Sequence, residues 1–123
     1  MRVLFPTEEN MGYYSKREAH FGKAKFYTIV TLEGGTIVDI TGVANPCHSE
    51  EAYGNAVTEI IKLKPDVLVV SGIGENPSSG LEKAGMRLYV DRVSQTVQMS
   101  IHKFIGDELQ QGEKLFSPLK QLN

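Results

Sequence analysis

The chain has 123 residues and a mass of 13.6 kDa, which is enough for one domain with its own core. Hydrophobic residues make up 41% and charged residues 23% of the chain, which excludes a disordered composition. Thirteen Lys and Arg against fifteen Asp and Glu give a net charge of −2, which argues against a dedicated nucleic-acid binder. The single cysteine excludes an internal disulfide and a metal cage built from the cysteines of one chain.

Hydrophobic runs are short throughout the sequence. The longest aliphatic run, residues 67–70, is far too short to span a bilayer, and residues 1–6 lack the long apolar region of a signal peptide. A lone cysteine also fits a reducing compartment. We therefore expect a cytoplasmic protein with no membrane and no nucleic-acid partner.

The first half of the chain predicts three strands. Residues 1–5 form a short apolar run that Pro6 is expected to stop. Residues 25–32 are rich in β-branched and aromatic side chains, and residues 36–43 resemble them. Gly34 and Gly35 between these two runs suit the positive φ angles of a tight turn, so the two runs predict a hairpin.

Helices and strands alternate in the second half. A helix is expected from a Ser49 cap to Pro65, followed by a strand over residues 66–70. A second helix starts near Asn76 and ends at Gly85, before a strand over residues 87–90. A third helix starts at Ser94 or Thr96, with Val97, Ile101, Phe104 and Ile105 on one side.

The order of elements is therefore β-β-β-α-β-α-β-α. A meander followed by alternating helices and strands predicts one mixed sheet with helices against both faces, an α/β fold. The sequence predicts a single domain over residues 1–110 and a C-terminal tail over residues 111–123, where periodicity is weak.

The first candidate site is a basic segment, residues 16–25, with a local charge of +3 against −5 for the rest of the chain. Arg17, Lys23 and Lys25 flank His20 in this segment. A lone histidine among basic residues suits an anionic ligand, as a donor or as a metal ligand, and the Gly22 amide lies beside it. From the spacing alone, a solvated loop with a partly packed histidine is the favoured explanation of the segment.

The second candidate is a glycine-containing turn that leaves the buried strand and enters the second helix. Gly72 and Gly74 allow backbone amides to approach an anion, and the helix start adds partial positive charge. Turns of this kind follow the carboxyl ends of strands, where open α/β sheets bind ligands. Close packing of a turn on the sheet is the simpler alternative.

Cys47 and His48 form the third candidate, because a thiolate and an imidazole can bind a soft metal. Adjacent side chains seldom converge on one point, so catalysis by this pair is not expected. His102 is expected to be a surface or boundary residue of the third helix. Two-metal nuclease chemistry needs clustered carboxylates, and none is evident in the sequence.

Residues 19–24 (AHFGKA), followed by an aromatic-rich strand, resemble the dinitrogenase iron–molybdenum cofactor biosynthesis family, in its single-domain NifX/NafY form. Residues 66–74 and then 81–90 follow the pattern of that family in the same order, and the similarity covers roughly residues 15–109. The resemblance implies a ribonuclease-H-like three-layer α/β/α fold with a mixed five-stranded sheet.

The resemblance also implies a function. It indicates a non-catalytic binder or carrier of an anionic iron–molybdenum or molybdenum–copper–sulfide cluster, with cluster donor and acceptor proteins as partners. His20 would contact the cluster, and Cys47 and His48 are further candidates for metal contact. The predicted cluster-binding set also contains Phe21, Gly22, Arg17, Lys23, Lys25, Gly72 and Gly74. A monomer or weak dimer is expected.

Two other functions stay open at this point. The candidate segments could bind a small anion or a partner protein in a non-catalytic regulatory or interaction domain. A hydrolase using the chemistry for which the ribonuclease-H-like fold is named is the least supported, because the clustered carboxylates are missing.

Overall fold

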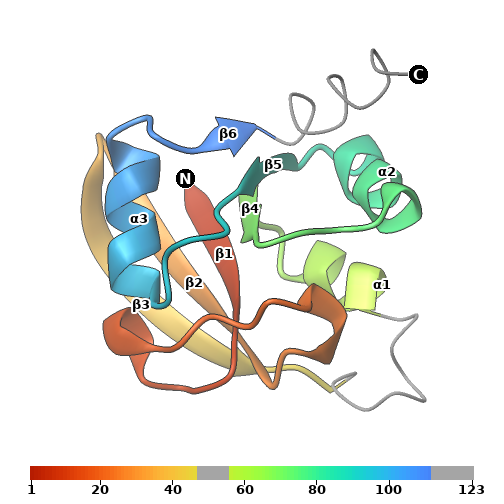
Figure 1. The fold of residues 1–123 in the computed structure, drawn as a ribbon, viewed down its shortest axis with the longest axis horizontal. Coiled ribbons are helices and arrows are strands. Elements are labelled where there is room, and N and C mark those ends of the chain that lie inside the picture. Colours follow the sequence, from red (N-terminus) through yellow and green to blue (C-terminus); the bar gives the residue numbers. More distant parts are fainter. Residues whose placement is uncertain (47–55, 112–123) are drawn as a thin grey trace.

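A mixed six-stranded sheet in the order β3-β2-β1-β4-β5-β6 is the centre of the computed structural model (Figure 1). The structure describes residues 1–46 and 56–111. The strands are β1 (Arg2–Thr7), β2 (Phe26–Glu33), β3 (Thr36–Ala44), β4 (Val67–Val70), β5 (Arg87–Val90) and β6 (Gln110–Gln111). The helices are α1 (Ala56–Lys62), α2 (Glu75–Lys83) and α3 (Val97–Ile105), with two short 3-10 helices, η1 (Gly12–Tyr14) and η2 (Phe21–Lys23).

The β2–β3 hairpin confirms the predicted pairing. Gly34 and Gly35 at its turn have φ angles of 58° and 81°, which are accessible to glycine at no steric cost. On the other side of β2, β1 pairs antiparallel with it and parallel with β4, and β4 pairs parallel with β5. The carboxyl ends of β1, β4 and β5 therefore lie at the same edge of the sheet.

Helices cover both faces of the sheet, as predicted (Figure 1). On one face, Ala56 and Ile60 of α1 and Leu81 of α2 pack with side chains of β1, β2, β4 and β5. On the other face, Val97 and Ile101 of α3 pack with the alternate side chains of β1, β2 and β4. Because β4 is buried on both faces, all four of its residues are apolar.

The sheet has six strands, so the expected number of five is wrong. The additional strand, β6, consists of two glutamines that pair with Tyr89 and Val90 of β5. Backbone pairing of two polar residues leaves no hydrophobic pattern that a sequence could show. The predicted boundary between residues 110 and 111 falls inside β6, and residues 112–123 lie outside the described part. The ribonuclease-H-like assignment stays a prediction.

Pro6 lies inside β1 and does not stop it, which corrects the prediction. It stands opposite Tyr27, and the parallel pairing with β4 is confined to Val3 and Leu4. The Pro6 nitrogen therefore faces a side where no ladder hydrogen bond is needed. Its carbonyl accepts a hydrogen bond from the Glu18 amide at 2.9 Å, so residues around position 17 continue the sheet edge where β4 does not reach.

The second-half helices follow the prediction where they are described, except that α2 starts at Glu75 after Gly74, so Asn76 is not its cap. Thr96 caps α3, because its side chain accepts a hydrogen bond from the Met99 amide at 3.3 Å. The Ser49 cap lies outside the described residues, and the described part of that helix is α1. In the described part of the chain, no helix is long and apolar enough to cross a membrane.

Candidate functional site

An open pocket of about 390 Å³ lies just beyond the carboxyl end of β4. It is lined by Ala19, His20 and Phe21 from one segment and by residues 71–74 from another. The first two candidate segments of the sequence therefore meet in one pocket, although they are far apart along the chain.

The His20 side of the pocket is anchored by its neighbour in sequence. Phe21 is only 6% exposed and packs in the core between the sheet and α1. The Tyr27 hydroxyl donates a hydrogen bond to the Phe21 carbonyl at 3.4 Å, and the Lys23 amide donates to the His20 carbonyl at 2.9 Å. Phe21 and Gly22 are buried, so η2 is fixed while the His20 side chain stays exposed at the pocket.

The opposite wall is the glycine turn, which we define as residues 71–74. Within the described residues, the amides of Gly72, Ile73 and Gly74 donate no backbone hydrogen bond, so they are available to an acceptor. Gly74 precedes α2, whose amino end adds partial positive charge. Neither Gly72 nor Gly74 has a positive φ, and a Cβ at Gly72 would meet nothing within 4 Å. The backbone itself does not require glycine at position 72.

Arg17 lies outside the pocket lining. Its side chain is only 3% exposed and forms an ion pair with Asp91, with 3.8 Å between Nη1 and Oδ2. Nη1 also donates hydrogen bonds to the carbonyls of Asp91 at 3.0 Å and Ser94 at 2.9 Å. This arginine therefore ties the segment before His20 to the chain that follows β5. Its predicted role in cluster binding stays a prediction.

The buried pair is stabilised mainly through hydrogen bonds to the carboxylate. Burial by itself would raise the pKa of Asp91, but the amides of Ser94 and Val93 and the Ser100 hydroxyl donate to this carboxylate. These bonds hold the pKa of Asp91 well below its usual value. Burial lowers the pKa of Arg17, and the Asp91 charge opposes that shift.

Asp91 is not among the residues that the sequence identifies as important for the site. An acidic residue directly after β5, at the carboxyl edge of the parallel strands, is the signal that marks it in the sequence. Its contribution is to hold the segment that leads to His20, because Arg17 is only three residues away along the chain.

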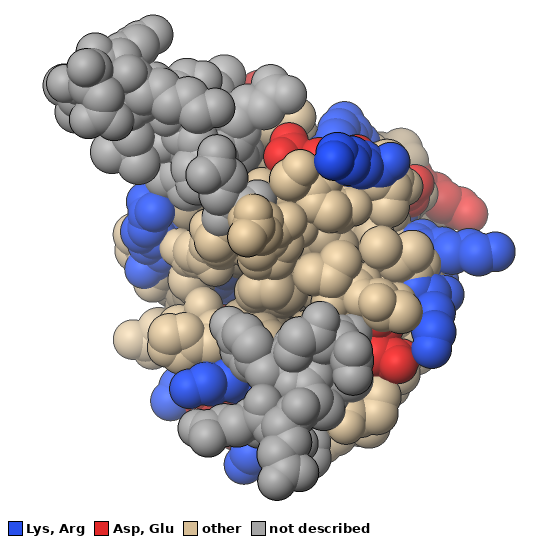
Figure 2. Space-filling view, turned by 90° about the vertical axis from the view of Figure 1, so that its right-hand side faces the viewer, with Lys and Arg blue, Asp and Glu red and all other residues tan. Residues whose placement is uncertain are grey.

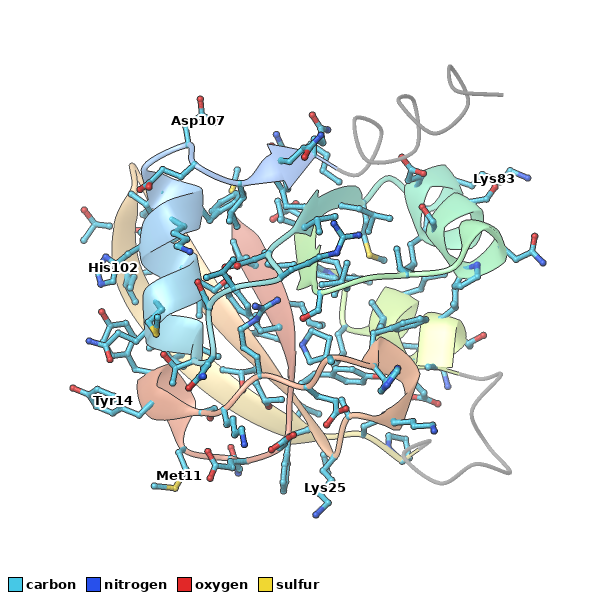
Figure 3. The ribbon with its side chains drawn as sticks, in the orientation of Figure 1. Met11, Tyr14, Lys25, Lys83, His102 and Asp107 are labelled. Atoms are coloured by element: carbon cyan, nitrogen blue, oxygen red, sulfur yellow. The ribbon has the colours of Figure 1, made fainter. Side chains whose placement is uncertain are left out.

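The other basic residues near His20 do not line the pocket. Lys23 and Lys25 are exposed, and Lys25 points away from the body of the protein (Figure 3). Lys16 lies 3.7 Å from Glu8 in a surface ion pair. Figure 2 shows the side of the molecule where α1 and α2 lie, with uncharged residues in its centre and Lys and Arg mostly at its rim. The local charge of +3 is therefore not concentrated on the pocket.

Two predicted metal candidates, Cys47 and His48, lie outside the described residues. Among residues 1–46 and 56–111, no group of three or more His, Cys, Asp or Glu side chains could hold a metal ion. His102 is exposed on α3, as predicted, and its Nε2 lies at the Tyr13 hydroxyl. Of the predicted set, the pocket lining brings together His20, Phe21, Gly72 and Gly74.

The chain matches one known protein family and is similar to several solved structures. A family model described as "Dinitrogenase iron-molybdenum cofactor" matches residues 1–107. The crystal structure of PH0822 is similar with a TM-score of 0.76 and 25% identity, covering 90% of this chain and 94% of that one. The apo form of the orange protein from Desulfovibrio gigas has a TM-score of 0.76 and 22% identity, covering 90% and 92%.

A third similar structure is that of a candidate NifB protein from Thermotoga, with a TM-score of 0.72, 23% identity and coverage of 89% and 91%. A comparison with curated proteins gives no match. The structural likeness to the two less similar proteins concerns the fold alone.

Proposed function

Because the chain belongs to the dinitrogenase iron–molybdenum cofactor family, which suggests a role in the biosynthesis or binding of that cofactor, we propose that its pocket carries such a cluster. The cargo would be an anionic metal–sulfur cluster of the iron–molybdenum or molybdenum–copper–sulfide type. The protein would take it from a donor protein and release it to an acceptor protein in the cytoplasm.

The observation that carries this proposal is the meeting of His20 and the glycine turn in one open pocket. An exposed imidazole can bind a metal atom of the cluster. The unused amides of the glycine turn can donate hydrogen bonds to its sulfides, and the start of α2 favours its negative charge.

The lining also favours a carrier over an enzyme or a permanent metal centre. His20 is the only titratable side chain among the seven residues that line the pocket in the described structure. A bare metal ion needs three or four protein ligands, whereas a preformed cluster brings its own sulfides. A single imidazole ligand leaves the cluster exchangeable, and among the described residues the pocket lining holds no second acid or base for proton transfer.

Anaerobic titration with isolated iron–molybdenum cofactor, and separately with thiomolybdate and copper, tests the proposal. The wild-type protein should give new visible absorption that saturates, and His20→Ala should weaken this binding at least about tenfold, as expected for loss of a direct ligand. His102→Ala is the matched control, because His102 is also exposed but lies on α3, outside the pocket lining.

Absence of binding by the wild-type protein would contradict the carrier function. Equal binding by wild type and His20→Ala would mean that the cluster binds at another site on the protein. Binding of simple anions without any metal, unaffected by His20→Ala, would favour the small-anion or interaction domain.

A further inference from the structure

The longest strand of the sheet, β3, lies at the edge of the sheet (Figure 1). It has nine residues, and each is exposed or half-buried. An edge strand of this length presents unpaired backbone groups to which another strand can add. Asp39 is the only charged residue in β3, and the strand contains neither Lys nor Pro, two residues that commonly block such edges.

The register of the hairpin identifies the free backbone groups. The Asn45 amide donates to the Lys25 carbonyl at 2.9 Å, so these opposite residues form a hydrogen-bonded pair. Hydrogen-bonded and non-hydrogen-bonded pairs alternate in an antiparallel ladder, and Phe26 stands opposite Ala44. The N–H and C=O groups of Ile40, Gly42 and Ala44 therefore point away from β2.

A bulge limits the regular part of this edge. The register shifts between Thr31, which faces Asp39, and Leu32, which faces Ile37, so Val38 is an extra residue. Residues 39–44 form the regular edge. Two-fold pairing of this segment with itself around Gly42 would use all six outward groups of the three residues in each copy.

Side chains next to this edge also suit a protein interface. The helix η1 packs on β3, since a Cβ at Gly12 would lie 3.9 Å from Ile40 Cγ2. Beside it, Met11 and Tyr14 are 64% and 65% exposed and point away from the body of the protein (Figure 3). Methionine and tyrosine are enriched in interfaces, so they would form an apolar rim.

We infer that the β3 edge binds a second copy of this chain, antiparallel and around a two-fold axis at Gly42, which makes one continuous sheet across the dimer. A second copy satisfies all the outward groups of this segment, because each outward N–H of one segment meets an outward C=O of the other. In this arrangement Asp39 faces Asn45 of the other copy, so no two carboxylates are opposite each other. This inference does not depend on cluster binding.

Sedimentation equilibrium and amide hydrogen exchange test the inference on the full chain. The weight-average mass should rise towards the dimer between about 10 µM and 1 mM, the range for a contact of a few strand hydrogen bonds. Over the same range, exchange of the Ile40, Gly42 and Ala44 amides should slow, while the Thr41 and Val43 amides, which already face β2, should not change.

Thr41→Lys should weaken the dimer about fivefold or more, because two added ammonium groups would lie close to the two-fold axis. Thr36→Lys is the matched control, since Thr36 is an exposed residue of the same strand beyond the bulge. Thermal melting confirms that both variants fold. A monomer at all concentrations, or a dimer that both variants form equally well, or protection of amides outside this edge, would overturn the inference.

Discussion

Asp91 pairs with the buried guanidinium of Arg17, and this pair holds the segment that leads to His20. Its side chain is 2% exposed and pairs with Arg17, three residues before His20. Asp91→Asn would leave the guanidinium buried without a counter-charge, which costs about 3 kcal/mol of unfolding free energy. Asp39→Asn is the control, because Asp39 is exposed and its loss should cost less than about 0.5 kcal/mol. Urea unfolding at neutral pH measures both values.

The same carboxylate gives stability a defined pH dependence. Because the pKa of Asp91 is lowered in the folded state, its stabilisation is fully present above the unfolded pKa of about 3.9. It is lost as the pH falls below that value. The difference in unfolding free energy between the wild type and Asp91→Asn should therefore shrink from about pH 5 towards pH 2. A difference that stays constant over this range would show that the carboxylate charge is not what stabilises the fold.

At the scale of elements, the turn from β4 to α2 connects a core strand to a helix and also forms one wall of the pocket. Gly34 and Gly35 are explained by the hairpin, whereas Gly72 has neither a positive φ nor a neighbour that a Cβ would meet. Gly72 also lines the pocket. Glycine at this position thus keeps room for a ligand and leaves its amide accessible.

Gly72→Val should therefore fold normally and bind the cluster poorly. The branched side chain would project into the pocket and should lower the affinity about tenfold or more, comparable to the loss of a good hydrogen bond to a charged group. Gly72→Ala, which adds one methyl group, should give a smaller loss. Thermal melting and anaerobic titration together separate the effects. An unchanged affinity for Gly72→Val would place the cluster away from this turn.

Strong local patterns made most elements predictable from sequence. The β2–β3 hairpin follows from two β-branched runs around a glycine pair, and the α3 cap follows from Thr96. The sequence patterns gave wrong predictions where contacts between distant parts of the chain decide the local structure. Pro6 continues β1 because β4 ends its pairing at Leu4, and β6 forms from glutamines through backbone bonds alone.

For the molecule as a whole, the sequence located both halves of the pocket but not the distribution of charge around it. His20 and the glycine turn were recognised from chemistry that each could perform alone. Lys16 pairs with Glu8, which lies earlier in the chain, and Arg17 pairs with Asp91, which lies far along it. A count of charges along residues 16–25 cannot show such pairing, because it arises only when the chain folds.

This pairing predicts how binding responds to salt. Arg17 is neutralised by Asp91, Lys16 lies beside Glu8, and Lys25 points away from the body of the protein (Figure 3). An anionic cluster in the pocket would then be held by the imidazole and by backbone amides at short range, which salt screens little. Raising the salt from about 50 mM to about 500 mM should lower the affinity less than about threefold.

Anaerobic titrations at several concentrations of potassium chloride measure this dependence. The double variant Lys23→Ala, Lys25→Ala removes the two exposed lysines and should change the affinity by less than about threefold, because neither lines the pocket. A tenfold loss with salt that disappears in the double variant would instead mean that the lysines attract the cluster from a distance. In that case the charge of the segment, and not the shape of the pocket, would control uptake.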